Sequence, residues 1–159
     1  MRDVRIGAVM TPAPCTVPED ATLDQARRIL YRERIHHLPV TSGNRVVGML
    51  TDRDLNLVAY LANDLLPESE VLAGDACVRD PLTVPMDEPL VDALDAMARR
   101  RIGSALVVEK GRLVGIFTSH DACALLARRL RNPGAILVTR SYTTYPFDTT
   151  RRRGTPVRA

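Results

Sequence analysis

The 159-residue chain contains two copies of one sequence unit, 67 residues apart. When the sequence is shifted by this length, residues 14–57 align with residues 81–124 without a gap, and 16 of the 44 aligned positions are identical. Unrelated segments of average composition would share about three. Two copies are too few for a solenoid, and one copy alone is too short for a comfortable core. We therefore expect two similar halves packed about a pseudo-two-fold axis rather than two independent domains.

Each copy predicts the same order of elements, β-α-β-β-α, and therefore an α+β fold. In the first copy a short extended piece precedes a helix, whose start has the capping-box spacing Thr22 to Gln25. Strands over 37–41 and 45–50 form a hairpin, and a second helix runs from 51 to about 63. The second copy predicts strands over 104–108 and 112–117 and a helix over 119–131.

The predicted division of the chain follows from these two copies. Residues 1–63 form the first repeat with an N-terminal lead-in, and 64–76 form a connector. Residues 77–131 form the second repeat, and 132–159 are a basic, partly disordered C-terminal extension. Three aromatic residues in this extension favour order over 135–147, at a dimer interface.

The charge is distributed unevenly along the chain. The net charge is +3, but residues 140–159 hold five arginines and one aspartate, so residues 1–139 sum to −1. A nearly neutral folded part makes nucleic acid an improbable partner. No apolar stretch approaches the roughly 20 residues of a membrane span, and no secretory signal is visible.

The cysteines and histidines predict no metal site. Three cysteines without a CxxC pair indicate reduced thiols in the cytoplasm. His36 and His37 are adjacent, and neighbouring side chains on a strand point to opposite faces. They could not easily hold one metal ion together.

The repeated motifs resemble the CBS domain family in its tandem form, the Bateman module, of the stand-alone bacterial type. They are Ile35–Val40 with Val47–Asp54, and Ile102–Val107 with Val114–Asp121; residues 9–12 are similar to the family's lead-in segment. The resemblance covers roughly residues 7–131. It implies a regulatory module, not an enzyme, that needs no cofactor. Such a module binds an adenosyl ligand between the repeats: AMP, ADP or ATP, with S-adenosylmethionine or NAD as further options.

The resemblance also implies partners. Modules of this kind pair into a homodimer, a flat disk of four CBS repeats. The bound ligand changes the conformation of the disk and so signals in trans to an effector protein that the sequence does not name.

The Thr-x-x-Asp end of each motif suits this chemistry independently. Asp54 and Asp121 follow three residues after a threonine in the first helical turn, where a carboxylate can accept both ribose hydroxyl protons. The N–H groups of that turn and the helix dipole suit a phosphate. Arg53 and His120 supply positive charge. The same threonines and aspartates are also good helix caps, so a purely structural role stays open.

The candidate ligand-binding residues combine these motifs with the apolar pieces expected to sandwich adenine. They are Thr16, Val17, His36, His37, Leu38, Pro39, Thr51, Arg53, Asp54, Thr83, Val84, Ser104, Ala105, Thr118, His120 and Asp121. The copies are not equivalent, because His36-His37 can face a phosphate and Gly103-Ser104 carries no charge. Two occupied sites, one occupied site and none are all compatible with the sequence.

Two other functions were weighed against the ligand sensor. A structural or dimerisation module that binds no ligand and acts through protein–protein contacts is the alternative. An enzyme is disfavoured, because the consecutive residues Ser119, His120 and Asp121 cannot line up as nucleophile, base and orienter.

Overall fold

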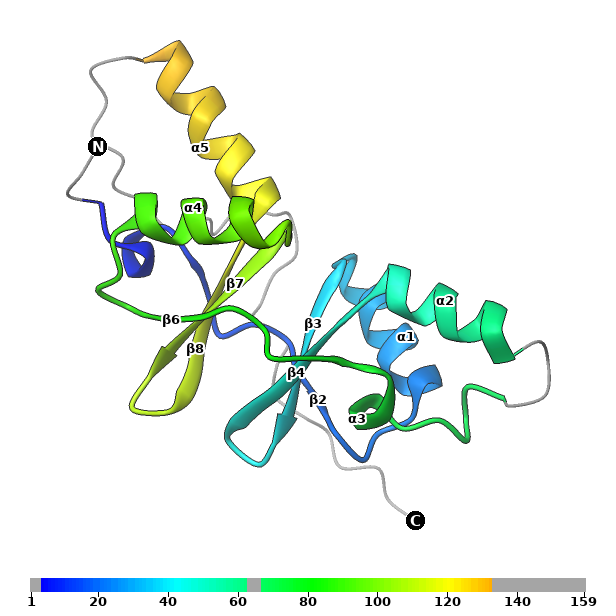
Figure 1. The fold of residues 1–159 in the computed structure, drawn as a ribbon. Helices are drawn as coiled ribbons and strands as arrows, with labels where there is room; N and C mark the ends of the chain where they lie inside the picture. The colour runs from blue at the N-terminus through cyan, green and yellow to red at the C-terminus, as the bar shows by residue number, and fades with distance from the viewer. Residues whose placement is uncertain (1–3, 63–66, 133–159) are drawn as a thin grey trace, which may run out of the picture.

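Each repeat builds one four-stranded sheet with helices against it, so the fold is α+β with two tandem repeats, as predicted (Figure 1). The structure is a computed structural model and describes residues 4–62 and 67–132. The extension expected over 132–159, including the order expected over 135–147, lies outside the described residues from 133 onward.

The two repeats have matching elements. The first contains β2 (Val17–Pro18), α1 (Leu23–Glu33), β3 (His37–Ser42), β4 (Arg45–Thr51) and α2 (Asp52–Ala62). The second contains β6 (Thr83–Pro85), α4 (Leu90–Arg100), β7 (Ser104–Glu109), β8 (Arg112–Thr118) and α5 (Ser119–Arg131). The segment before each repeat adds a short helix and a short strand: η1 (Ile6–Ala8) with β1 (Thr11–Pro12), and α3 (Ala73–Ala76) with β5 (Val78–Arg79).

Local sequence explains where the first helix begins and ends. Thr22 and Gln25 form the expected capping box, in which each side chain accepts a hydrogen bond from the other's backbone N–H at 3.3 and 3.1 Å. Arg34 ends α1 in the left-handed conformation at φ 52°, and Arg101 ends α4 in the same way at φ 53°. The hairpins after these helices therefore leave in equivalent directions.

The lead-in segments are exchanged between the repeats. β1 pairs antiparallel with β8 of the second repeat, and β5 pairs antiparallel with β4 of the first. The two strands are themselves 67 residues apart, so the duplication extends upstream of residue 14. In Figure 1 the blue N-terminal segment accordingly lies in the half that contains α4 and α5.

Burial follows the same exchange. Ile6 and Val9 belong to the core of the second repeat, and Ala73 and Cys77 to the core of the first. The sequence boundaries placed residues 6–12 in the first repeat and 73–76 in a connector, whereas the packing joins each to the opposite half. The lead-in of one repeat thus supplies an edge strand and core residues to the other.

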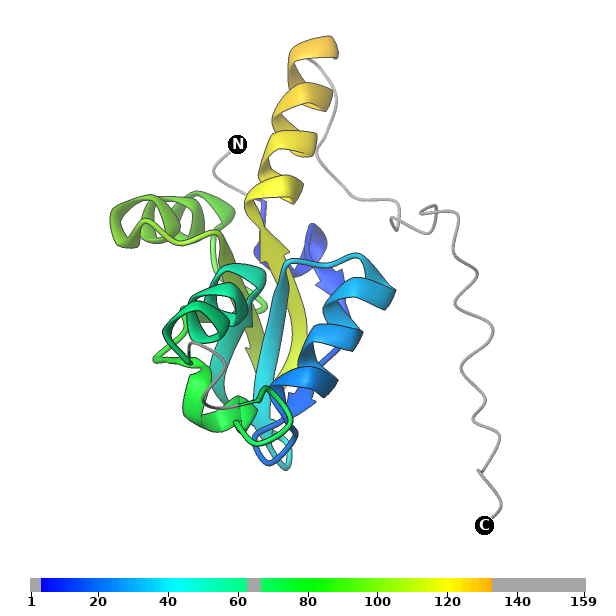
Figure 2. The same ribbon diagram turned by 90° about the vertical axis from the view of Figure 1, so that its right-hand side faces the viewer.

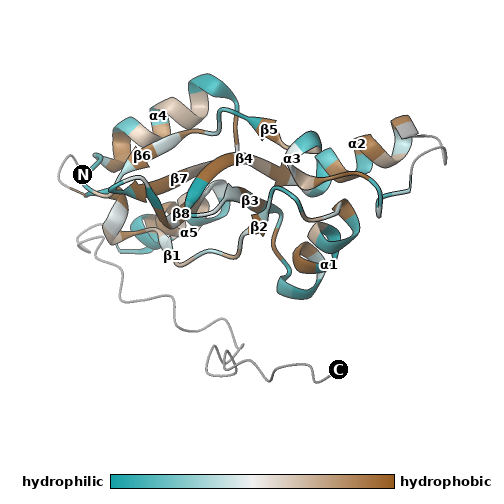
Figure 3. Ribbon diagram, turned by 90° about the horizontal axis from the view of Figure 1, so that it is seen from below, coloured by the Kyte–Doolittle hydropathy of each residue, from teal (hydrophilic) through white to brown (hydrophobic). Residues whose placement is uncertain are grey.

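A third apolar cluster joins the two halves. Met49 of β4, Leu106 of β7 and Ile116 of β8 form a buried group between the sheets, with Val46 and Leu113 packed against it. Figure 3 shows hydrophobic residues along β4 and β7 at this place. No helix among the described residues is both long and apolar enough to span a membrane.

Candidate ligand-binding site

Both Thr-x-x-Asp motifs stand where a hairpin ends and a helix begins. Asp54 Oδ2 accepts hydrogen bonds from the Thr51 N–H at 2.8 Å and from Thr51 Oγ1 at 2.7 Å. Asp121 Oδ2 accepts the equivalent bonds from Thr118, both at 2.7 Å. The aspartate N–H groups donate back to the threonine hydroxyls at 3.3 and 3.4 Å. The two helix starts therefore have nearly the same geometry.

These bonds show that the capping role is real in both copies. They also orient each carboxylate rigidly, because three bonds tie it to its threonine. All the bonds that these carboxylates accept within the motifs fall on Oδ2. A carboxylate has two oxygens and about four lone-pair positions, so Oδ1 keeps the capacity to accept hydroxyl protons from a ligand.

The structure sorts the candidate residues by exposure. The exposed residues are Thr16, His36, Arg53, Thr83 and His120. The half-buried residues are His37, Thr51, Asp54, Thr118 and Asp121. The buried residues are Val17, Leu38, Pro39, Val84, Ser104 and Ala105. Asp54 and Asp121 are thus partly open to solvent while remaining held by their caps.

The buried candidates have structural work inside the fold. Val17 and Leu38 lie in the core of the first repeat, and Val84 and Ala105 in that of the second. Pro39 pairs in register with Met49, so it lies on the sheet face between the repeats. The side chains of these residues are packed away from solvent, which leaves mainly their backbone groups for contact with an adenine edge.

The beginnings of β3 and β7 meet where the repeats join. A Cβ placed on Gly103 would lie 2.9 Å from His37 Nε2, closer than side chains approach one another. Gly103 therefore admits the imidazole, and its carbonyl accepts the Ser119 N–H at 2.9 Å. His37, from the first motif, is in this way brought to the helix start of the second motif.

His36 turns away from this junction. It is exposed, and its Nδ1 lies 3.0 Å from Asp52 Oδ2. One histidine is thus half-buried between the repeats and the other is on the surface, as alternation along a strand predicts. Asp52 and Gly103 were not among the sequence candidates. The offset of 67 residues was the available signal, because it places Gly103 at the position of His36 and Ser119 at the position of Asp52.

The electrostatic setting of His37 favours the neutral ring. Burial, and then the neighbouring His36, lowers the pKa of His37, while the carboxylates of Asp52 and Asp54 act in the opposite direction. A phosphate bound beside this ring would add another anion and favour the protonated form.

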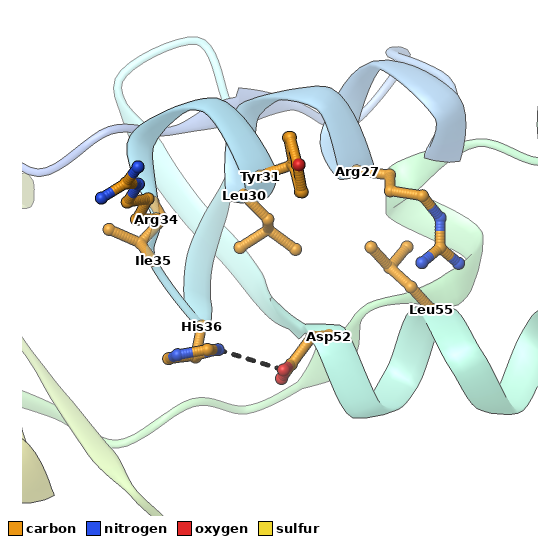
Figure 4. Close-up of a pocket in the computed structure, with 8 residues that line it drawn as sticks. All are labelled: Arg27, Leu30, Tyr31, Arg34, Ile35, His36, Asp52 and Leu55. Atoms are coloured by element: carbon orange, nitrogen blue, oxygen red, sulfur yellow. Dashed lines mark hydrogen bonds and ion pairs between the residues drawn. The ribbon is translucent and has the colours of Figure 1, made fainter.

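A pocket of about 410 Å³ lies on the helical side of the first repeat, away from the two aspartates. We call it the α1–α2 groove; it is lined by Arg27, Leu30, Tyr31, Arg34, Ile35, His36, Asp52 and Leu55. Figure 4 shows Leu30 and Leu55 between the two helices, with Arg34 and Arg27 at opposite ends. Of the sequence candidates, His36 alone lines this groove.

Other chemistry finds no support in residues 4–62 and 67–132. No group of three or more histidine, cysteine or acidic side chains there is placed to hold a metal ion. Cys77 is buried, and burial raises the pKa of its thiol, which makes it a poor nucleophile.

The CBS domain family model matches residues 6–58 and 73–128, which include both motifs and both exchanged lead-ins. The chain belongs to the CBS domain family. The two matches begin 67 residues apart, in agreement with the internal repeat.

Curated relatives contain this CBS pair in different settings. A homoserine O-acetyltransferase of Methanococcoides burtonii is 35% identical over 123 residues, 76% of this chain but 24% of that protein. This chain therefore spans about a quarter of the first relatives it matches. A CBS domain-containing protein of Dictyostelium discoideum is 32% identical over 80% of this chain and 94% of its own length. The human 5′-AMP-activated protein kinase subunit gamma-3 is 31% identical over 82% of this chain and 28% of its own length.

Solved CBS pairs have the same fold. A CBS domain protein from Pyrobaculum aerophilum, complexed with AMP, superposes with a TM-score of 0.70 at 26% identity, over 83% of this chain and 100% of that one. A CBS domain pair in complex with 5′-methylthioadenosine and S-adenosyl-L-methionine gives a TM-score of 0.67 at 26% identity, over 79% and 98% of the two chains. Both of these neighbours hold adenosyl compounds.

Proposed function

We propose that this CBS pair is a regulatory module that binds an adenosyl ligand, of the AMP, ADP or ATP type, and signals to a partner in trans. The observation that carries the proposal is the pair of rigidly held, partly exposed carboxylates, Asp54 and Asp121, at equivalent helix starts. The adenosyl compounds held by two similar CBS structures support the same ligand class.

The roles follow from chemistry. Asp54 and Asp121 accept the ribose hydroxyls, and Thr51 and Thr118 hold these carboxylates in place. Backbone groups of the buried strand residues, beside exposed Thr16 and Thr83, read the adenine edge. Ser104, at the start of β7, is the uncharged counterpart of His37.

The charges favour a ligand that carries phosphate. Arg53 and His120 are exposed at the first turns of α2 and α5, and His37 lies between the repeats. These cationic or protonatable groups attract an anion and disfavour the sulfonium of S-adenosylmethionine. We therefore place nucleotides ahead of S-adenosylmethionine and NAD, and the first motif ahead of the second.

Signalling then requires two conformations with different ligand affinity. A ligand that contacts both repeats shifts the angle between them only by its difference in affinity for the two arrangements. We propose that the working unit is a cytoplasmic homodimer, a disk of four CBS repeats, that acts on an effector protein and catalyses no reaction itself.

Thermal unfolding with a panel of ligands tests this function. The panel contains AMP, ADP, ATP, NAD, S-adenosylmethionine and GMP, each at millimolar concentration. A ligand at 100 times its Kd adds about 2.7 kcal/mol of stability, which is readily seen as a rise in Tm. We expect adenine nucleotides to raise Tm and GMP to leave it unchanged.

Variants of the two aspartates locate the site. Because the two caps have nearly equal geometry, Asp54→Ala and Asp121→Ala should each lower the stability of the free protein by a similar amount, about 1–2 kcal/mol. We expect Asp54→Ala to reduce the nucleotide-dependent rise in Tm more. Asp54→Asn is the matched control, since its amide oxygen can still accept the Thr51 N–H while the charge is removed.

A structural dimerisation module without a ligand is the second candidate. The complete caps favour it, because both motifs are satisfied with no ligand bound. If no nucleotide changes Tm, this second function replaces the first.

A further inference from the structure

The helices of the two repeats expose different surfaces. On α2 the exposed apolar side chains are Leu57, Tyr60 and Leu61, with 53%, 81% and 69% of their surface accessible. They continue from the α1–α2 groove, beside which Tyr31 of α1 is 87% exposed. This surface is hollow, aromatic and apolar. A residue set of this size on the outside of a fold commonly marks an interaction site.

The second repeat has a protruding surface instead. Leu126 and Leu130, four residues apart on α5, are 57% and 73% exposed, and we call them the α5 ridge. Figure 2 shows that α5 projects beyond the sheets and the other helices. One repeat thus offers a groove and the other offers a helix that can enter one.

Charge distinguishes the two surfaces further. Arg128 and Arg131 are exposed on the last turns of α5, next to the ridge. From Leu55 to Ala62, α2 contains no charged residue. A guanidinium can stack on exposed tyrosine rings such as those of Tyr31 and Tyr60.

We infer that the α1–α2 groove and the adjoining face of α2 receive α5 of a second copy, so that the chain dimerises head-to-tail. This inference rests on the homodimer proposed above and specifies its orientation. In a head-to-tail dimer each copy contributes one groove and one ridge, so the two-fold axis makes the contact twice. In a head-to-head dimer, α5 would lie against α5 of the second copy, and their arginines would repel one another.

Cysteine cross-linking in the full chain separates the two orientations. The background is Cys15→Ser with Cys123→Ser, which removes the half-buried and the exposed thiol and keeps buried Cys77. Tyr60→Cys and Leu126→Cys are introduced into separate chains of distinguishable mass, which are coexpressed and then oxidised. We expect cross-linked dimers that contain one chain of each kind, and little cross-linking when either variant is expressed alone. Self-cross-linking of Leu126→Cys as the main product would overturn the head-to-tail arrangement.

Charge removal gives an independent readout of the same interface. Arg128→Gln with Arg131→Gln should weaken a head-to-tail dimer several-fold in sedimentation equilibrium, because the contacts with the aromatic face are lost. It would strengthen a head-to-head dimer by relieving repulsion, and that result would contradict the inference. Arg112→Gln, an exposed arginine at the β7–β8 hairpin, is the control and should leave the dimerisation constant unchanged.

Dimerisation and ligand binding fail in distinguishable ways. A chain that sediments as a monomer at micromolar concentration would overturn the head-to-tail dimer and the homodimer together. If AMP or ATP still raises its Tm, the ligand-binding function stands without them. A dimer with the expected cross-links but no nucleotide response would keep this inference and reject the ligand.

Discussion

The two repeats have nearly identical helix caps and very different surroundings. The Thr-x-x-Asp bonds agree within 0.1 Å between the copies. Around them, the first repeat has two histidines where the second has Gly103 and Ser104, and an uncharged stretch of α2 where α5 carries arginines. Local folding therefore constrains the motif itself, whereas the residues facing the other repeat and the solvent have diverged. Divergence of this kind is expected when one of two duplicated sites keeps the ligand and the other keeps the fold.

The exchanged lead-ins give the strongest test of this comparison. Gly48 and Gly115 are equivalent glycines, each covered by a lead-in that belongs to the other repeat. A Cβ on Gly48 would meet the Val78 carbonyl oxygen and Cys77 Cβ, each at 3.0 Å. A Cβ on Gly115 would meet only the side chain of Met10, which is flexible.

Gly48→Ala should therefore cost more stability than Gly115→Ala. We expect a loss of about 2–3 kcal/mol for Gly48→Ala, because backbone and a buried short side chain must move, and about 1 kcal/mol or less for Gly115→Ala. Urea unfolding of the two variants measures both. Equal losses would mean that Met10 is as firmly packed as β5, and that the two lead-ins are mechanically equivalent.

Sequence reasoning recovered the elements but not this exchange. The strong periodicity of each copy predicts α1, α4 and both hairpins to within a residue or two, because local propensity and capping decide them. The lead-ins share only Gly7 and Gly74 between residues 6–13 and 73–80. Their partners are set by contacts with strands far away in the chain, and a pattern of local residue types does not contain that information.

The candidate site shows the same division. The two caps and the separation of His36 from His37 follow from short-range spacing and could be predicted. The burial of Val17, Leu38, Val84 and Ala105 depends on which sheet face each strand turns to its own helices. The approach of His37 to Gly103 depends on how the two repeats pack, which only the assembled structure provides.

The histidine that distinguishes the first repeat should make stability depend on pH. Since burial lowers the pKa of His37, the unfolded chain binds its proton more readily than the folded chain. Stability should be greatest above the ordinary histidine pKa of about 6.5 and should fall as the pH falls towards the lower folded value. His37→Gln should flatten this slope in urea unfolding between pH 7.5 and 5. His120→Gln, an exposed counterpart at the start of α5, should preserve it.

Nucleotide binding should change the sign of this effect on affinity. A phosphate beside His37 favours the protonated ring, so we expect binding to tighten as the pH falls from 7.5 to 6, and His37→Gln to remove the trend. A nucleotide affinity that does not vary with pH in the unsubstituted protein would place the phosphate away from His37.

The smallest expected effect concerns an ion pair that only the first repeat has. Arg27 of α1 donates from Nε to both carboxylate oxygens of Glu68 at 3.1 and 2.8 Å, and from Nη1 to Asn56 Oδ1 at 3.2 Å. The equivalent of Arg27 in the second repeat is Leu94, which packs against the core of that repeat. The first repeat thus ties the segment after α2 to its helices by a bidentate pair where the second uses an apolar contact.

A double-mutant cycle of Arg27→Ala and Glu68→Ala should give a coupling energy of about 0.5–1 kcal/mol, because the Arg27 side chain is 39% exposed and solvent screens the pair. The hydrogen bonds from Arg27 lower the pKa of Glu68, so the coupling should persist at neutral pH and disappear as the pH falls through that lowered value. It should also weaken in 1 M salt. A coupling that survives both acid and salt would show that Arg27 acts through packing of its stem, as Leu94 does, and the two repeats would then be stabilised at this position by the same kind of contact.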